Sequence, residues 1–150
     1  MAVLNSRTYK QIEWRLYHYH ELRRQVEDSP NQRLDVLHRS RTPATPGGGG
    51  VAHRSDPTAS KVLQIVQIED QQAEAKRWVE VIEQVIRRYG RNPQDRLKGQ
   101  LLELRYFAQM DEGYISQRLC IDRSTFYFWK AEIVTYAALI AAQHGLLKVS

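Results

Sequence analysis

The sequence contains only one cysteine, Cys120, among its 150 residues. A single thiol cannot form a disulfide within the chain, which excludes the small secreted domains that depend on disulfides. We therefore expect a reducing, intracellular setting. The chain has no apolar run of the roughly 18 residues that a membrane span needs, and its first fourteen residues lack an apolar signal core. The closest approach is YAALIAAQHGLL, residues 136–147, which predicts a buried helix and no membrane partner.

Residue groups that would carry catalysis or bind a metal are scarce. His18 and His20 are two positions apart, so a helix would point them to different sides, and the other three histidines have no partner at ligand spacing. The four glycines 47–50 lack the strand, lysine and helix of a phosphate-binding loop. The acidic residues between 69 and 74 stand beside two basic ones, which favours an ion-paired surface over a cation site. We expect neither an enzyme nor a cofactor or metal.

The charge is basic but widely spread. Lysine and arginine number 22 against 17 acidic residues, a net charge of +5. Residues 1–41, 60–90 and 91–150 each hold a similar mixture of both signs, and none is a polybasic tail. This balance is compatible with a polyanionic partner such as DNA. Attraction to phosphate should be modest for one copy, so useful affinity would require several copies on the DNA.

Helical periodicity divides the chain into four segments and predicts an all-α protein. Residues 1–39 are expected to form an N-terminal helical segment, with a helix from Ser6 to Asp28 capped by Ser6 and a short helix around Leu34 to Leu37. Residues 40–59 have the proline and glycine content of a flexible linker. Residues 60–90 predict one long central helix, and residues 91–150 a C-terminal unit.

The long helix carries an apolar seam whose members recur every three or four residues, interrupted only at Gln72. They are Ile65, Ile68, Ala75, Val79, Ile82, Ile86 and Tyr89. Such a pattern is typical of a coiled coil, so one interpretation is a homodimer through the seam from Ile68 to Tyr89. The other is that the seam packs inside the chain. Further apolar positions, Leu63, Val66, Trp78, Val81 and Val85 among them, widen the stripe enough to serve both.

The stretch EGYISQRLCIDRSTFYFWK, residues 112–130, matches the pattern of a helix-turn-helix. A first short helix would place Ile115, Ser116 and Leu119 inward, and a tight turn would follow at Cys120. Inward positions of the turn and the second helix are then filled by apolar residues: Ile121, Phe126 and Trp129. In such motifs the second helix enters the major groove of DNA.

We expect the outward residues of this motif to bind DNA. They are Arg118, Arg123, Ser124, Thr125, Tyr127, Phe128 and Lys130. Arginine can pair with guanine and hydroxyls with phosphate, whereas Tyr127 and Phe128 can meet a thymine methyl or a sugar, and Lys130 and Arg118 a backbone phosphate. Asp122 should cap the second helix through the amide of Ser124 or Thr125.

Helices on either side of the motif should hold it in place. A support helix from Arg96 would use the face of Leu97, Leu101, Leu104 and Ala108, and would break at residues 110–112. The recognition helix should continue from Arg123 to His144, with Gly145 as its stop signal. Beyond Lys130 this helix is apolar on most sides, which predicts that it is buried.

With these residues the chain resembles the phage transcriptional activators of the RinA and ArpU type. The resemblance rests on TYKQIEWRLYHYHEL, on GGGG followed by SDPTASKVLQI, and on ISQRLCIDRSTFYFWKAEIVTYAALIAAQHGLL, whose first part also resembles the promoter-binding helix-turn-helix of sigma factors. It implies an all-helical activator of phage or prophage late genes in the bacterial cytoplasm, bound to double-stranded promoter DNA. Two modes stay open: the protein recruits host RNA polymerase, or it acts as a sigma-like factor. The resemblance also implies DNA contacts at the motif positions given above.

Two other functions fit the same pattern. A small terminase subunit is also helical and DNA-binding, but it recognises packaging-site DNA as a ring. A helical adaptor that binds no DNA would use the long helix for protein contacts. The size of the assembly in solution separates the first alternative from an activator, and a DNA-binding assay separates the second.

Overall fold

The computed structural model describes residues 4–28 and 57–147 of the chain. Within these residues the structure is helical and has no strand, so the predicted all-α class is confirmed. The α-helices are α1 (Ser6–Tyr17), α2 (Tyr19–Glu27), α4 (Pro57–Arg91), α5 (Arg96–Leu102), α6 (Glu112–Leu119) and α7 (Arg123–Gln143). A 3-10 turn η2 (Pro93–Asp95) and a π-helical turn η3 (Glu103–Phe107) flank α5. The short helix predicted around Leu34 to Leu37 and most of the predicted linker lie outside the described residues.

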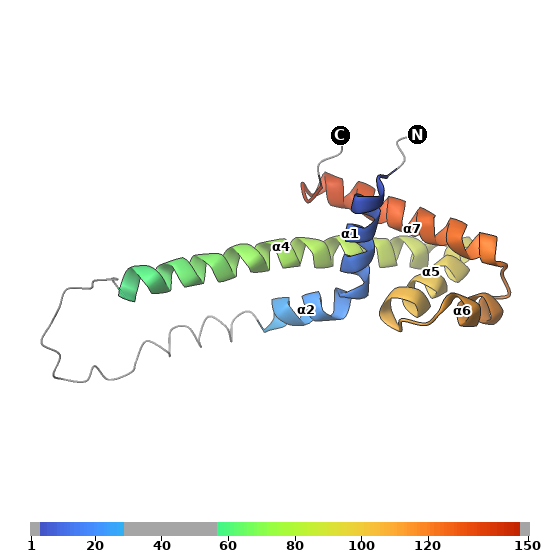
Figure 1. Cartoon of the computed structure of the whole chain (residues 1–150), viewed down its shortest axis with the longest axis horizontal. Helices are drawn as coiled ribbons and strands as arrows, with labels where there is room; N and C mark the ends of the chain where they lie inside the picture. Colours follow the sequence, from blue (N-terminus) through green and yellow to red (C-terminus); the bar gives the residue numbers. More distant parts are fainter. Residues whose placement is uncertain (1–3, 29–56, 148–150) are drawn as a thin grey trace, which may run out of the picture.

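The N-terminal helix is divided where one continuous helix was expected. α1 ends at Tyr17, and His18, with φ −101° and ψ 16°, separates it from α2. The His18 side chain lies 2.7 Å from the Trp14 carbonyl oxygen and stacks on the Trp14 ring. Asn5 rather than Ser6 caps α1, because its side-chain oxygen accepts the Thr8 amide at 2.8 Å. This break lets α1 cross the bundle while α2 lies along α4 (Figure 1).

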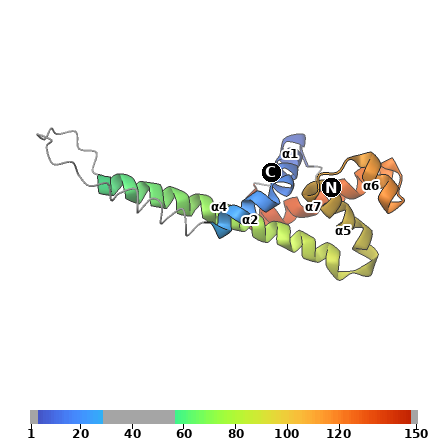
Figure 2. The same ribbon diagram turned by 90° about the horizontal axis from the view of Figure 1, so that it is seen from below.

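The predicted long central helix is confirmed as α4, which is about 52 Å long at 1.5 Å per residue. Its C-terminal half forms the centre of the core, where a wide stripe of side chains is buried: Ala75, Trp78, Val79, Val81, Ile82, Val85 and Tyr89. The N-terminal half extends beyond the other described helices (Figures 1 and 2) and exposes Val62, Leu63 and Val66. The seam from Ala75 onward therefore packs inside the chain. The homodimer stays a prediction, and its surface must lie largely outside that buried stretch.

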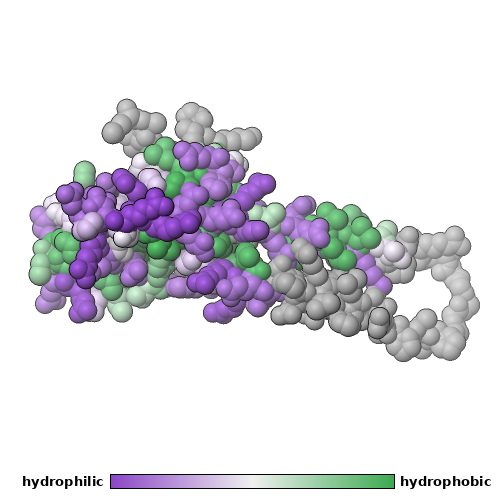
Figure 3. Space-filling view, turned by 180° about the vertical axis from the view of Figure 1, so that it is seen from behind, coloured by the Kyte–Doolittle hydropathy of each residue, from purple (hydrophilic) through white to green (hydrophobic). Residues whose placement is uncertain are grey.

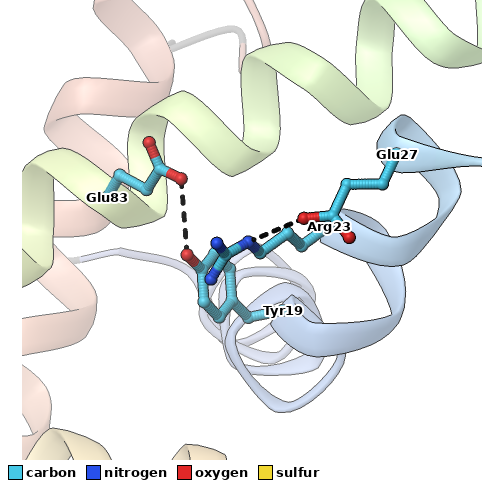
Figure 4. A network of polar contacts seen from close by, with 4 residues as sticks. All are labelled: Tyr19, Arg23, Glu27 and Glu83. Atoms are coloured by element: carbon cyan, nitrogen blue, oxygen red, sulfur yellow. Dashed lines mark hydrogen bonds and ion pairs between the residues drawn. The ribbon is translucent and has the colours of Figure 1, made fainter.

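The packing of α2 on α4 includes a polar contact at its edge. Tyr19 is almost fully buried, and its hydroxyl donates to Glu83 Oε1 on α4 at 3.4 Å. On α2 itself, Arg23 Nε pairs with Glu27 Oε1 at 3.2 Å (Figure 4). Burial raises the pKa of the Tyr19 hydroxyl, and the nearby Glu83 carboxylate raises it further. The Tyr19 hydroxyl thus stays protonated as a donor to Glu83.

The support helix runs from α5 into the π-turn η3, and this turn changes which residues face inward. A π-turn holds one more residue per hydrogen-bonded ring than an α-helix, so it rotates the following side chains. Leu101 is buried as expected and Leu104 partly so, but Leu97 and Ala108 are exposed. Leu102 and Tyr106 are buried instead. The predicted apolar face is therefore wrong at Leu97 and Ala108. The π-turn accounts for Ala108, which follows it, but not for Leu97, which precedes it.

Candidate nucleic-acid interface

The first helix of the predicted motif forms as expected. Asp111 caps α6 by accepting the Tyr114 amide at 2.8 Å. Ile115 and Leu119, one turn apart, are both buried against the core. The Ser116 hydroxyl donates to Glu112 Oε1 at 2.9 Å, so this polar side chain has a partner one turn earlier on the same helix. The burial of Ile115 and Leu119 depends on local spacing, which explains why the sequence predicts it, whereas the Asp111 cap and the bond from Ser116 to Glu112 were not predicted.

The turn between the two helices is tight and uses a left-handed residue. Cys120 has φ 55° and ψ 46°, and the amide of Ile121 donates to the Ser116 carbonyl oxygen at 3.0 Å. This arrangement is common after the last residue of a helix, where glycine usually occupies the left-handed position. The Cys120 side chain is exposed, whereas Ile121 packs on the core. The predicted turn position is therefore confirmed.

Asp122 fixes the start of α7. Its Oδ1 accepts the Thr125 amide at 2.8 Å, which confirms one of the two predicted capping contacts. Hydrogen bonds from Thr125, through both its hydroxyl and its amide, lower the pKa of this carboxyl below 3.8. The carboxylate is therefore charged at neutral pH and stands at the positive end of the helix dipole.

The first two turns of α7 present an inner apolar side and an outer mixed side. Phe126 is fully buried and Trp129 packs partly on the core. On the outside, Arg123 and Ser124 are exposed, and Phe128 is the most exposed large apolar side chain in the described residues, at 71%. Tyr127 is 43% exposed, whereas Thr125 is half-buried beside the cap. The outer side of this helix start therefore combines exposed aromatic rings with polar and basic side chains.

Two cations flank the ring of Tyr127. The guanidinium carbon of Arg123 lies 5.6 Å from the ring centroid, and Lys130 Nζ lies 5.4 Å from it. Arg118 is exposed in the last turn of α6, on the other side of the turn. The α6–α7 corner therefore exposes two arginines, Arg118 and Arg123, beside the rings of Tyr127 and Phe128 and the carboxylate of Asp122. Such a surface can bind phosphate through its cations and bases or sugars through its rings.

Lys130 does not face outward as the sequence predicted. Its side chain is only 12% exposed, and Nζ forms an ion pair with Glu13 Oε2 of α1 at 3.2 Å. Its amine also lies 5.9 Å from the ring of Tyr9. The prediction of an outward Lys130 is therefore wrong, because a carboxylate from the N-terminal helix draws the amine back toward α1.

Two residues that the sequence did not single out position the site. Glu13 holds Lys130, and its Oε2 also accepts the hydroxyl of Tyr106 at 2.8 Å. Arg105 donates to the Met110 carbonyl oxygen at 3.1 Å, just before α6, and its guanidinium lies 5.8 Å from the ring of Phe126. Glu13 connects segments that are distant in the sequence, and Arg105 connects the start of α6 with Phe126 on α7. No local pattern identifies such residues.

Other kinds of site find little support in the described residues. Within residues 4–28 and 57–147, no three histidine, cysteine or acidic side chains gather as metal ligands. None of the helices described combines the length and apolar character needed to cross a membrane. Comparison with protein-family models, curated proteins and solved structures gives no significant match. The fold and the site together define an all-α protein with a long central helix and a C-terminal helix-turn-helix.

Proposed function

We propose that this chain is a sequence-specific DNA-binding transcription activator of phage or prophage late genes. The observation that carries the proposal is the exposed start of α7, where Arg123, Ser124, Tyr127 and Phe128 stand on a capped helix after a tight turn. In a helix-turn-helix these positions meet base edges and phosphates in the major groove. The resemblance to the RinA and ArpU activators supplies the late-gene role and the partnership with host RNA polymerase.

The contacts divide by chemistry. Arg123 is the residue suited to bidentate pairing with guanine, because its guanidinium is exposed and already placed against Tyr127. Ser124 suits phosphate, since its hydroxyl is exposed in the first helical turn, whereas Thr125 is half-buried and its amide is held by Asp122. Phe128 suits a thymine methyl, and Arg118 a phosphate on the α6 side. Lys130 is left out of this set because Glu13 holds its amine.

Selection from a pool of randomised DNA duplexes tests the proposal. The purified protein should enrich one sequence, and Arg123→Ala should weaken binding to it by about 1–3 kcal/mol while relaxing the preference at one position. Arg24→Ala, at an exposed arginine of α2, is the matched control and should bind as the wild type does. If the wild type enriches no sequence, the DNA-reading role is lost and the adaptor alternative stands.

A transcription assay with bacterial RNA polymerase then separates an activator from a packaging protein. The protein should increase transcription from a template that carries the selected sequence upstream of a promoter, and Arg123→Ala should not. The mass of the assembly in solution gives a second measurement. A closed ring of many copies would contradict the activator role and favour a small terminase subunit.

A further inference from the structure

The end of α4 and the start of α5 carry four arginines that the motif does not use: Arg87, Arg88 and Arg91 on α4, and Arg96 on α5. All four are exposed, and none forms an ion pair in the part of the chain that the structure describes. We name these four residues the arginine surface. The helix dipole favours cations at a helix C-terminus. Like charges one turn apart, such as Arg87 and Arg91, nevertheless repel each other when nothing is bound.

The arginine surface lines two hollows. One has a volume of about 290 Å³ and is lined by Gln84, Arg87, Arg88, Arg91 and Tyr136. The second, of about 490 Å³, shares Arg91 and adds Arg96 with the polar side chains of Asn92 and Gln100. Arg88 lies 5.7 Å from the ring centroid of Tyr136 on α7, which holds its guanidinium at the first hollow. Guanidinium groups at a hollow with amide and hydroxyl donors suit the oxygens of phosphate.

The acidic groups near the arginine surface are mostly engaged elsewhere. Glu132 on α7 is paired with Lys98 Nζ at 2.8 Å, and the same amine lies 3.8 Å from Asp95. Glu83, one turn before Arg87 on α4, accepts the hydroxyl of Tyr19 at 3.4 Å. Glu103 is the acidic residue in the lining of the second hollow, and its carboxylate would repel an anion there. The first hollow has only positive and neutral groups in its lining.

The position of the hollow relative to the recognition helix suggests its ligand. Tyr136 follows Arg123 by 13 positions on α7, which places them about 20 Å apart along the helix axis. Exposed residues of α7 recur on one side, at Ser124, Phe128, Glu132 and Thr135, and Tyr136 lies next to that side. In B-form DNA about 20 Å spans roughly six base pairs, at 3.4 Å each. Arg123 and Tyr136 flank this exposed side from opposite edges, so a duplex that covers the side at Ser124 and Phe128 reaches the arginine surface at its edge.

We propose that the arginine surface binds the phosphate backbone of the same DNA duplex that α7 reads, as a second contact that carries no sequence information. This inference rests on the proposed function. It adds a phosphate contact to a chain whose modest net charge predicts only weak attraction to DNA for one copy. Arg87, Arg88 and Arg91 hold phosphates at the first hollow, and Arg96 extends the contact across the second. Backbone contacts of this kind fix the position of a protein on DNA and increase its affinity for every sequence.

Salt dependence of DNA binding tests the inference. Affinity for the selected duplex is measured by fluorescence anisotropy over a series of salt concentrations for the wild type and for Arg87→Gln/Arg91→Gln. Each lost phosphate contact lowers the slope of log K against log salt by about 0.9. The double variant should therefore lower the slope by about 1.8 and weaken binding roughly tenfold to a hundredfold at low salt. The sequence that it selects should not change.

The control has the same change of charge at another place. Arg24→Gln/Lys76→Gln removes two exposed cations from α2 and from α4 beside it, and should leave the slope as in the wild type. A double variant at Arg87 and Arg91 that matches this control would overturn the inference while leaving the role of Arg123 intact. A wild type that binds no duplex overturns both proposals. Loss of binding at the arginine surface with no effect of Arg123→Ala overturns only the reading role of α7. Helical circular dichroism of each variant checks that it is folded.

Discussion

Lys130 on the recognition helix is ion-paired with Glu13 on the first helix, at 3.2 Å between Nζ and Oε2. The pair is largely enclosed, with side chains 12% and 17% exposed, and Glu13 also accepts the hydroxyl of Tyr106 on η3. Three segments that are distant in the sequence thus meet at one carboxylate. The orientation of α7 depends on α1, so the N-terminal helix is part of the structure that positions the residues proposed to contact DNA.

Glu13→Ala should destabilise the protein by about 2 kcal/mol, because it leaves the amine of Lys130 and the hydroxyl of Tyr106 without their partner. Urea denaturation followed by circular dichroism measures the loss. Lys130→Met alone should also destabilise the fold, but Glu13→Ala/Lys130→Met should cost less than the two single changes added together. Additive losses would show that the two side chains do not interact.

The helix-turn-helix could be predicted because its signals are local. Ile115, Leu119 and Phe126 recur at spacings that only a pair of short helices buries together, and Asp122 stands one position before the first residue of α7. The inward Lys130 could not be predicted in this way. Its partner, Glu13, is on another helix. The residues next to Lys130 in the sequence are the same whether its side chain faces solvent or a remote carboxylate, so the local pattern cannot distinguish the two.

The fold shows the same division. Period and length predicted α4, but the break at His18 and the π-turn at Glu103–Phe107 depend on hydrogen bonds that hydrophobic spacing does not encode. The two interpretations of the α4 seam also required the structure, since an apolar stripe has the same pattern whether it packs on its own chain or on a second copy. Trp78 and Val85 are buried inside the chain, which accounts for the width of the stripe.

Cys120→Gly should stabilise the protein by about 1 kcal/mol. Cys120 holds φ 55°, a left-handed conformation in which a side chain is disfavoured and glycine is not. The side chain is exposed, so removing it gives up little packing. The measurement is the free energy of unfolding from urea titration. Cys120→Ala is the control and should show no gain, because alanine keeps the Cβ atom, and Cys120→Val should lose stability because its Cβ is branched.

Alkaline pH should destabilise the fold in part through Tyr9. Burial, with a further contribution from Glu13, raises the pKa of the Tyr9 hydroxyl from 10.0 to about 12 in the folded chain. The unfolded chain therefore releases this proton first. The stability that Tyr9 contributes is fully present below pH 10 and is lost as pH rises toward 12.

The measurement is the urea midpoint of unfolding as a function of pH above neutrality. The wild type should lose stability across this range, and Tyr9→Phe should lose less because it lacks this phenol. Some loss should remain, because Tyr17, Tyr19, Tyr89 and Tyr106 keep their own raised pKa values. Tyr114→Phe, at an exposed phenol on α6, is the control and should follow the wild type. Equal alkaline losses in Tyr9→Phe and the wild type would contradict the assignment.

Aspartate substitutions at two positions of α4 should separate folding from self-association. Ile82 is 1% exposed in the core, so Ile82→Asp should unfold the protein, at a cost of several kcal/mol for a buried unpaired charge. Leu63 is 62% exposed on the extended half of α4, and Leu63→Asp should keep the helical circular dichroism and melting temperature of the wild type. Figure 3 shows the apolar surface at this end of the molecule.

If the wild type is a dimer by light scattering, Leu63→Asp should lower its mass to that of a monomer, because the exposed apolar residues on α4 would then be the joining surface. A folded dimer that survives Leu63→Asp would place the dimer contact elsewhere, and a folded Ile82→Asp monomer would contradict the burial of the seam within the chain.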